Sequence, residues 1–240
     1  MRKILGLIVF CICFSGASPA RASVIITYDA DNPITHAGPL PSSALNLSGQ
    51  LPDTVYGNLG PDLNAVNVFA ISIFQPLNFS AFTFPVAHGA QDTELFLFNS
   101  SGRAVYENDD ISASDTLSCL PSLSGTNPCP SSRGGLAPIA SGLYYLAITR
   151  SQQLPWDSAQ NYLFTVPVDS TSLGGPNLAA GGANPIARWD GGAFTDPNFD
   201  NSFYGIALTG TTPEPGTMLM LSVAGALGLL LRKRLSSNCA

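Results

Sequence analysis

The stretch Val68-Phe69-Ala70-Ile71-Ser72-Ile73 decides the fold. Apolar side chains occupy both alternating sets of positions in it, as in a central strand that is buried on two sides or covered by a loop. The stretch is short and rich in β-branched and aromatic residues, which favours a strand over a helix. It therefore predicts a buried strand inside a larger sheet.

Similar short apolar runs fill the sequence between the two ends of the chain. Gly, Pro, Asn and Asp separate these runs, and no stretch keeps a helical period over the length of a helix. The predicted strands are 24–28, 67–74, 77–84, 93–98, 104–106, 143–149, 162–168 and 203–209. They predict an all-β fold, a single antiparallel β-sandwich of jelly-roll type, over residues 23–212. The glycine-rich stretch 169–201 is expected to form an ordered loop before the closing strand.

Residues 1–22 have the three parts of a secretory signal peptide. Two cations, Arg2 and Lys3, precede an apolar run, and Ala20 and Ala22 form a small-x-small cleavage site. The expected partners at this end are the general secretion machinery and a signal peptidase. The mature chain is expected to begin at Ser23.

The C-terminal end combines a Pro213-Glu214-Pro215 motif, an apolar run over 217–231 and the basic cluster Arg232-Lys233-Arg234. Fifteen helical residues span about 22 Å, which is short against a hydrocarbon core of about 30 Å. The predicted transmembrane helix therefore spans with thinning of the bilayer and snorkelling of its cations. The positive-inside rule places the basic cluster in the cytoplasm and the domain outside the inner membrane.

This three-part pattern resembles the PEP-CTERM sorting signal of Gram-negative bacteria that produce exopolysaccharide. The resemblance implies recognition by an exosortase, a membrane-embedded processing enzyme, and cleavage near the Pro-Glu-Pro motif. It also implies transient anchoring in the inner membrane, followed by release or attachment at the cell surface. Residues 213–234 form the expected sorting signal and 235–240 a short tail; a plain single-pass anchor is the alternative.

Most of the basic residues lie in the two terminal signals, so the domain between them is strongly acidic. The 240 residues hold 10 Lys and Arg against 16 Asp and Glu, a formal net charge of −6. Six of the cations lie in the two terminal signals, which leaves four against sixteen acidic residues, or fifteen if Glu214 is also lost. The mature net charge is then −12 or −11, which excludes nucleic acid as a partner. With only 11% charged residues, the composition also disfavours disorder and coiled coils.

Cys119 and Cys129 are the cysteines that remain between the two signals. In an exported protein, two cysteines ten residues apart in a sequence rich in Pro, Ser and Gly predict one disulfide that staples a surface loop. A catalytic cysteine is the alternative.

A second resemblance covers residues 67–168. The strand-like run Asp92-Thr93-Glu94-Leu95-Phe96-Leu97-Phe98, the loop Asn108-Asp109-Asp110 and the strand-like run Gly142-Leu143-Tyr144-Tyr145-Leu146 are similar to the bacterial pre-peptidase C-terminal domain. This resemblance implies a β-sandwich of jelly-roll type. The insertion from 115 to 135, which carries the two cysteines, departs from the family's compact pattern.

The acidic residues of this region form a candidate Ca²⁺ site. Asp92 and Glu94 lie one hairpin away from Asn108, Asp109 and Asp110, and Ca²⁺ takes about six to eight oxygen ligands from carboxylates, amides and carbonyls. The spacing does not match an EF-hand loop. The alternative is that these residues form Asx-turns at a solvated hairpin. No other cofactor is expected.

Two tryptophans beside aspartates form a candidate glycan contact. Trp156 precedes Asp157, and Trp189 precedes Asp190; an aromatic ring can stack on a sugar while a carboxylate binds its hydroxyls. The alternative is that each tryptophan is a hydrophobic plug that folds a long loop onto the sheet.

The function predicted from these features is that of a non-catalytic, exported β-sandwich protein. It would act at the cell surface or in the extracellular matrix, in association with exopolysaccharide or other matrix proteins. The histidines His36 and His88 lie in loop-like sequence, and no hydrolase or zinc motif occurs. No catalytic residue is therefore predicted, and a secreted hydrolase acting on glycans or peptides through an unrecognised site is the alternative.

Overall fold

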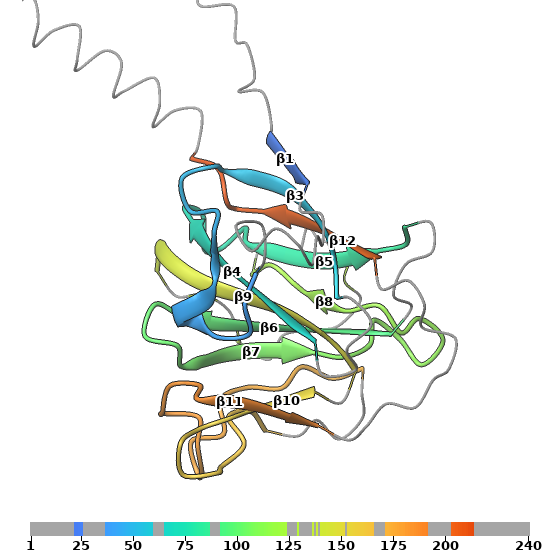
Figure 1. Ribbon diagram of the computed structural model, residues 1–240. Helices are drawn as coiled ribbons and strands as arrows, with labels where there is room; N and C mark the ends of the chain where they lie inside the picture. The colour runs from blue at the N-terminus through green and yellow to red at the C-terminus, as the bar shows by residue number, and fades with distance from the viewer. Residues whose placement is uncertain are drawn as a thin grey trace, which may run out of the picture.

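The computed structural model describes residues 22–25, 37–59, 65–86, 92–123, 129, 136, 138, 140–151, 153–165, 171–191 and 203–213. Within these residues the chain forms two five-stranded sheets and one two-stranded sheet. Figure 1 shows the three sheets as successive layers, with β1, β3 and β12 at the top and β10 and β11 at the bottom. The predicted all-β sandwich is confirmed.

The first sheet has the strand order β1-β3-β12-β5-β8. Its strands are β1 (Ala22–Ile25), β3 (Pro52–Asn58), β12 (Phe203–Thr209), β5 (Ser80–Phe84) and β8 (Cys119–Leu120). All neighbours in this sheet are antiparallel except β1 and β3, which run parallel. The last strand of the domain therefore lies at the centre of this sheet.

The second sheet has the order β2-β4-β9-β6-β7 and lies in the middle of the molecule (Figure 1). Its strands are β2 (Leu45–Asn46), β4 (Val66–Ile73), β9 (Gly142–Arg150), β6 (Thr93–Asn99) and β7 (Ala104–Asn108). A short 3-10 helix, η2 (Pro41–Ser43), precedes β2. Only the two-residue strand β2 runs parallel to its neighbour.

Strand β4 is buried on both faces, as its sequence predicts. Phe69, Ile71 and Ile73 point into the core between the two five-stranded sheets, whereas Val66 and Val68 belong to a second core on the other face. Full burial of one such side chain stabilises the fold by about 1.5–3 kcal/mol. The middle sheet is therefore held by apolar packing on both sides.

A small third layer covers the outer face of the middle sheet. It contains β10 (Gln153–Trp156) and β11 (Arg188–Gly191), which pair antiparallel. Phe96 and Phe98 of β6 pack beneath it against Phe164 and Trp189. The expectation that the glycine-rich stretch 169–201 is only a loop is therefore wrong.

The glycines of that stretch permit tight turns, and an apolar residue that follows them is buried. Gly181 and Gly182 lie so close to Asn161 and Asn177 that a side chain on either would overlap the backbone there. Ile186, further along, is only 8% exposed and belongs to the second core. A high glycine content therefore did not exclude this segment from a core.

Asp157 holds the turn that follows β10. One of its carboxylate oxygens accepts the backbone N–H groups of Ala159 and Asn161, and the other accepts the side-chain amides of Asn161 and Asn184. These hydrogen bonds, led by the one from the Asn161 backbone, lower the pKa of Asp157 to about 2. The carboxylate is therefore fully used for structure.

The predicted strands correspond to most of the observed ones. The prediction 203–209 coincides with β12, whereas residues 77 and 78 of the prediction 77–84 lie in a turn and β5 begins at Ser80. The prediction 162–168 is wrong in its described part, because Tyr162 and Phe164 make only isolated bridges. Strands β3 and β10 were not predicted, since Pro52, Gly57 and Pro155 interrupt their apolar pattern.

Cys119 and Cys129 lie as a bonded pair, with Cα atoms 5.7 Å apart. This separation is typical of disulfides. Cys119 belongs to β8 and is 1% exposed. A disulfide between them, which remains a prediction, would tie Cys129 to the edge of the first sheet.

The terminal signals fall almost entirely outside the described residues. Ala22 begins β1 and Pro213 follows the last described turn, whereas Ala20 and residues 214–240 are not described. No helix among the described residues combines the length and the hydrophobicity needed to cross a membrane.

Candidate metal centre

Three strand ends meet at one edge of the middle sheet. Strand β6 lies between β9 and β7 and is antiparallel to both, so it begins where they end. Asp92 precedes β6, Asp109 and Asp110 follow β7, and Ser151 follows β9. The topology therefore gathers residues that are far apart in the sequence.

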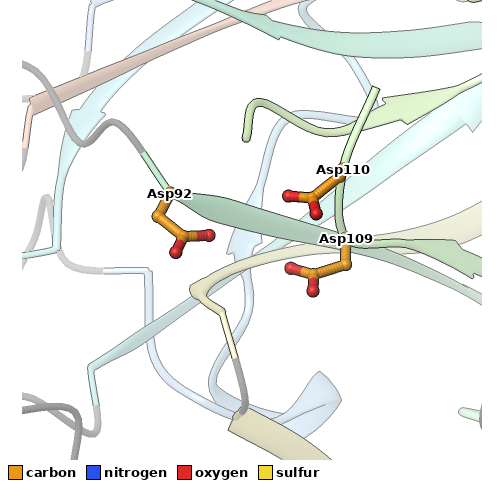
Figure 2. A group of neighbouring side chains, drawn as sticks. All are labelled: Asp92, Asp109 and Asp110. Carbon is orange, nitrogen blue, oxygen red and sulfur yellow. The ribbon is translucent and has the colours of Figure 1, made fainter. Parts of the chain in front are cut away.

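Asp92, Asp109 and Asp110 form one cluster, which we call the acidic cluster. Each offers a carboxylate oxygen that lies within 4.8 Å of those of the other two. Figure 2 shows Asp92 approaching from the start of β6 and the other two from the end of β7, with all three carboxylates turned toward the same space. The sequence analysis named all three as ligands.

Hydrogen bonds satisfy only part of the acidic cluster. The Ser151 hydroxyl donates to Oδ2 of Asp109 at 3.3 Å. Oδ1 of Asp109 and Oδ1 of Asp110 are both shielded from solvent, and neither has a hydrogen-bond donor within the described part of the chain. Buried carboxylate oxygens without a donor are costly, and they are suitable ligands for a hard cation.

Burial and nearby negative charges raise the pKa values of Asp92 and Asp109. The pKa of Asp92 rises to about 6, through burial and the charge of Asp110, against a hydrogen bond from Ser151 that lowers it. The pKa of Asp109 rises to about 7, through burial first and then the charges of Asp110 and Asp92. Two unit charges at such separations repel by about 3 kcal/mol at an effective dielectric constant of about 20. The cluster therefore favours a bound proton or a bound cation.

Glu107 extends this negative region along β7. It lies two residues before Asp109 and therefore on the same face of the strand, and it is only 1% exposed. Both of its carboxylate oxygens are buried without a hydrogen-bond partner in the described residues. Burial, and then the charge of Asp109, raise the pKa of Glu107 to about 8.

Gly174 closes over the Glu107 carboxylate. A side chain at position 174 would begin 1.8 Å from Oε1 of Glu107, so any residue larger than glycine would displace the Glu107 carboxylate. The sequence analysis missed Glu107 because a single glutamate in a short strand usually faces solvent. Its neighbours Val105 and Asp109 gave no sign that Gly174, 67 residues later, covers it.

Glu94 and Tyr162 lie in the same electrostatic environment. Glu94 is 4% exposed in β6, and its charge, with those of Glu107 and Asp109, adds to the burial that raises the pKa of Tyr162. Glu94 is not among the three carboxylates that meet within 4.8 Å. The structure therefore places it near the acidic cluster but not in it.

The side chain of Asn108 has a structural role. Its Oδ1 accepts the backbone N–H of Cys119 at 2.8 Å, and its amide donates to the carbonyl oxygens of Asp110 and Ser172. Asn108 lies on the face of β7 opposite to Asp109. It shapes the loop that carries the acidic cluster.

The two tryptophans face opposite sides of the third layer. Trp189 points inward, with its ring 5.1 Å from that of Phe96, and its indole N–H donates to the carbonyl of Pro39. This is the arrangement of a hydrophobic plug. Trp156 pairs across the ladder with Arg188 and lies on the other face, where the Arg188 guanidinium is 5.5 Å from its ring centroid.

Asp190 completes this outer face. It forms an ion pair with Arg188, with an N···O distance of 2.8 Å. The side chain of Asp190 is 53% exposed and that of Arg188 is 43% exposed. Trp156 is half-buried, with its ring centroid 6.0 Å from that of Tyr162. With the exposed side chains of Arg188 and Asp190 it forms an aromatic and polar surface, which we call the hairpin surface.

Comparison with known families identifies the C-terminal end. Residues 211–234 match the family of the PEP-CTERM protein-sorting motif. The chain carries a PEP-CTERM sorting motif. No curated protein and no solved structure matches the chain, and the resemblance to the pre-peptidase C-terminal domain remains a prediction.

The PEP-CTERM motif defines how the protein reaches its site of action. It indicates an exported protein that is processed at the membrane by an exosortase-type enzyme and then displayed at the surface. The match begins at Thr211, which is buried. Only Thr212 and Pro213 follow it in this last described segment. The sorting motif therefore follows the domain directly.

Proposed function

We propose that this exported protein is a non-catalytic component of the cell surface or extracellular matrix, which binds Ca²⁺ at the acidic cluster and exopolysaccharide at the hairpin surface. The observation that carries the cation site is the convergence of three carboxylates from two strand ends. The PEP-CTERM motif supports the location.

Ca²⁺ would relieve a specific electrostatic problem. Asp92, Asp109 and Asp110 supply carboxylate oxygens, which are the ligands that Ca²⁺ prefers. Glu107 is an independent indication, since it is buried, unpaired in the described residues and repelled by Asp109. A cation held by the acidic cluster would offset the repulsion among its three carboxylates and the repulsion between Asp109 and Glu107. Its effect would be structural, because it would join the start of β6 to the end of β7.

The hairpin surface supports the exopolysaccharide contact. Trp156 offers a ring for stacking on a sugar, while Arg188 and Asp190 offer a donor and an acceptor for hydroxyl groups. Trp189 is occupied inside the fold, so the contact is assigned to Trp156. The strongly acidic domain favours neutral or cation-bridged polysaccharide over a free polyanion.

Retention on immobilised exopolysaccharide tests this function. The wild-type chain should be retained, Trp156→Ala should lose most of the retention, and Leu178→Ala, at an exposed apolar position on another turn, should retain it. Wild-type protein that is not retained contradicts the exopolysaccharide role. Hydrolysis detected in a broad screen of glycan and peptide substrates would favour the alternative, a secreted hydrolase.

A further inference from the structure

The last described residues are fixed to the domain up to the start of the sorting motif. The carbonyl of Gly210, which has a φ of +72°, accepts the backbone N–H groups of Phe74 and Gln75. The Thr211 hydroxyl donates to the carbonyl of Pro52 at 2.6 Å, and the Gln75 amide donates to the carbonyl of Thr212 at 2.8 Å. No flexible linker separates the fold from Pro213.

The beginning of the domain lies at the same place. Strand β1 starts with Ala22 paired to Pro52, the residue whose carbonyl Thr211 also contacts. Figure 1 shows both ends of the domain leaving on the side of the first sheet, away from β10 and β11. Both terminal signals therefore attach at one end of the molecule.

The distance from this end to the membrane is limited by the chain itself. The apolar run of the sorting motif begins at Thr217, five residues after Thr212. Five extended residues span at most about 17 Å. While the sorting motif is anchored, the turn that holds Thr212 must therefore lie within about that distance of the bilayer.

This turn exposes large apolar side chains. Phe74 is 41% exposed and Leu77 is 63% exposed. Leu143, 39% exposed, lies on the neighbouring strand as the partner of Ser72, two residues before Phe74. We call Phe74, Leu77 and Leu143 the exit patch. They are three of the six large hydrophobic side chains that are exposed in the described part of the chain.

Three of the segments that meet at this end carry no charge, whereas Asp53 follows Pro52 in β3. Residues 65–86, 140–149 and 203–213 contain no Asp, Glu, Lys or Arg, although the mature chain is strongly acidic. An anionic bilayer repels acidic surfaces within a Debye length of about 8 Å. The uncharged segments that carry the exit patch can therefore approach lipid closely.

We propose that, before processing, the domain rests on the outer surface of the inner membrane with the exit patch inserted among the lipid headgroups. The occupant is the bilayer, because the sorting motif enters it within reach of these residues. Leucine and phenylalanine side chains gain from burial at this boundary. The inference rests on membrane-anchored processing and is independent of the Ca²⁺ and exopolysaccharide sites. Removal of the sorting motif would free the domain from this contact.

A depth measurement on the full-length chain tests the proposal. The chain is reconstituted in vesicles of phosphatidylethanolamine and phosphatidylglycerol, with a solvatochromic non-natural amino acid at position 77 or, as the control, at Leu178, which is 76% exposed. Nitroxide-labelled lipids should quench the probe at 77 at least about two-fold more than the probe at 178. The emission at 77 should also shift to shorter wavelength.

Flotation and a second variant separate the outcomes. A chain that does not float with the vesicles overturns the anchoring and this inference together, whereas a chain that floats with equal quenching at both positions overturns the inference alone. Shielding of position 77 that appears only after an exosortase is added identifies a protein as the occupant and also overturns it. With the probe at 143, the double substitution Phe74→Ser and Leu77→Ser should reduce quenching, with an unchanged circular dichroism spectrum as the check on folding.

Discussion

Glu107 and Gly174 hydrogen-bond to each other through both of their backbone groups, with N···O distances of 2.9 Å and 3.1 Å. The pairing brings the covering segment onto the edge strand β7 and seals the Glu107 carboxylate from water. It joins the middle sheet to the stretch that the sequence presents as a glycine-rich loop.

Substitution of Gly174 should therefore be more damaging than that of an open glycine. Gly174→Ala places a methyl group 1.8 Å from Oε1 of Glu107, and overpacking of this kind costs about 1–3 kcal/mol. Gly49→Ala is the control, because nothing lies within 4 Å of its added carbon. Urea unfolding measures both. Equal stabilities of the two variants would contradict the close approach, and a Glu107→Ala background should reduce the cost.

Calcium should stabilise the wild-type domain through the acidic cluster. At a concentration of about 100 times Kd, a bound ion adds about 2.7 kcal/mol, which raises Tm by about 5–10 °C for a domain of this size. Asp109→Asn should lose most of this shift, whereas Asp190→Asn, at the hairpin surface, should keep it. An unchanged Tm in the wild type, or an equal shift in Asp109→Asn, would disprove the site.

In the absence of metal, stability should fall as pH rises from about 4 to about 8. The folded pKa values of Asp92, Asp109 and Glu107, about 6, 7 and 8, lie above the ordinary values of 3.8, 3.8 and 4.5. In this pH range the folded state therefore binds more protons than the unfolded state. The free energy of unfolding then decreases as the pH rises. Asp110, Glu94 and Tyr162 face the same region.

Thermal melting in a chelator, across this pH range, measures the effect. Saturating Ca²⁺ should flatten the profile, because the ion keeps the carboxylates of the acidic cluster charged in the folded state. A Tm that rises from pH 5 to pH 8 in the chelator would contradict the raised pKa values.

The disulfide should contribute measurably to stability. The chain-entropy relation gives about 2.8 kcal/mol for the loop that Cys119 and Cys129 close. The double substitution Cys119→Ser and Cys129→Ser should lower Tm by about 5–10 °C. Mass spectrometry of the unreduced mature chain should show a mass about 2 Da below that of the reduced chain. Equal masses before and after reduction would show that the bond does not form.

Trp189 and Trp156 should separate stability from binding. Trp189→Ala removes a ring packed on Phe96 and Phe98 and should cost about 3–5 kcal/mol. Trp156 is half-buried on the outer face, between Tyr162 and Arg188, so Trp156→Ala should cost less than half as much in the same urea titration. The reverse order would mean that Trp156 is the plug.

The sequence predicted the strands whose apolar pattern is uninterrupted. Strand β12 was predicted residue for residue, and β4 was predicted with both faces buried. Strand β3 was missed because Pro52 and Gly57 break its pattern, although Gly57 is needed there: a side chain on it would begin 2.2 Å from the Tyr204 hydroxyl oxygen. A contact across 147 residues has no local signal.

The three carboxylates of the acidic cluster were predicted from the sequence, but their surroundings were not. Asp109 and Asp110 are adjacent, and Asp92 lies one hairpin away, so local spacing suggested that they meet. Ser151 and Glu107 complete the region through the β9 ladder and through the covering segment at Gly174. Those contacts depend on sheet order and on a third layer, neither of which alternation along a single strand reveals.

The position of β12 has a consequence for when the domain folds. This strand lies between β3 and β5, so the first sheet stays in separate pieces until residues 203–209 are available. The apolar run of the sorting motif begins at Thr217, eight residues after β12 ends. A chain that crosses the membrane from its N-terminus therefore completes this sheet only as its last segment enters the bilayer. For a chain exported in this direction, completion of the first sheet would follow the emergence of residues 203–209 and would coincide with the arrival of the sorting motif at the membrane.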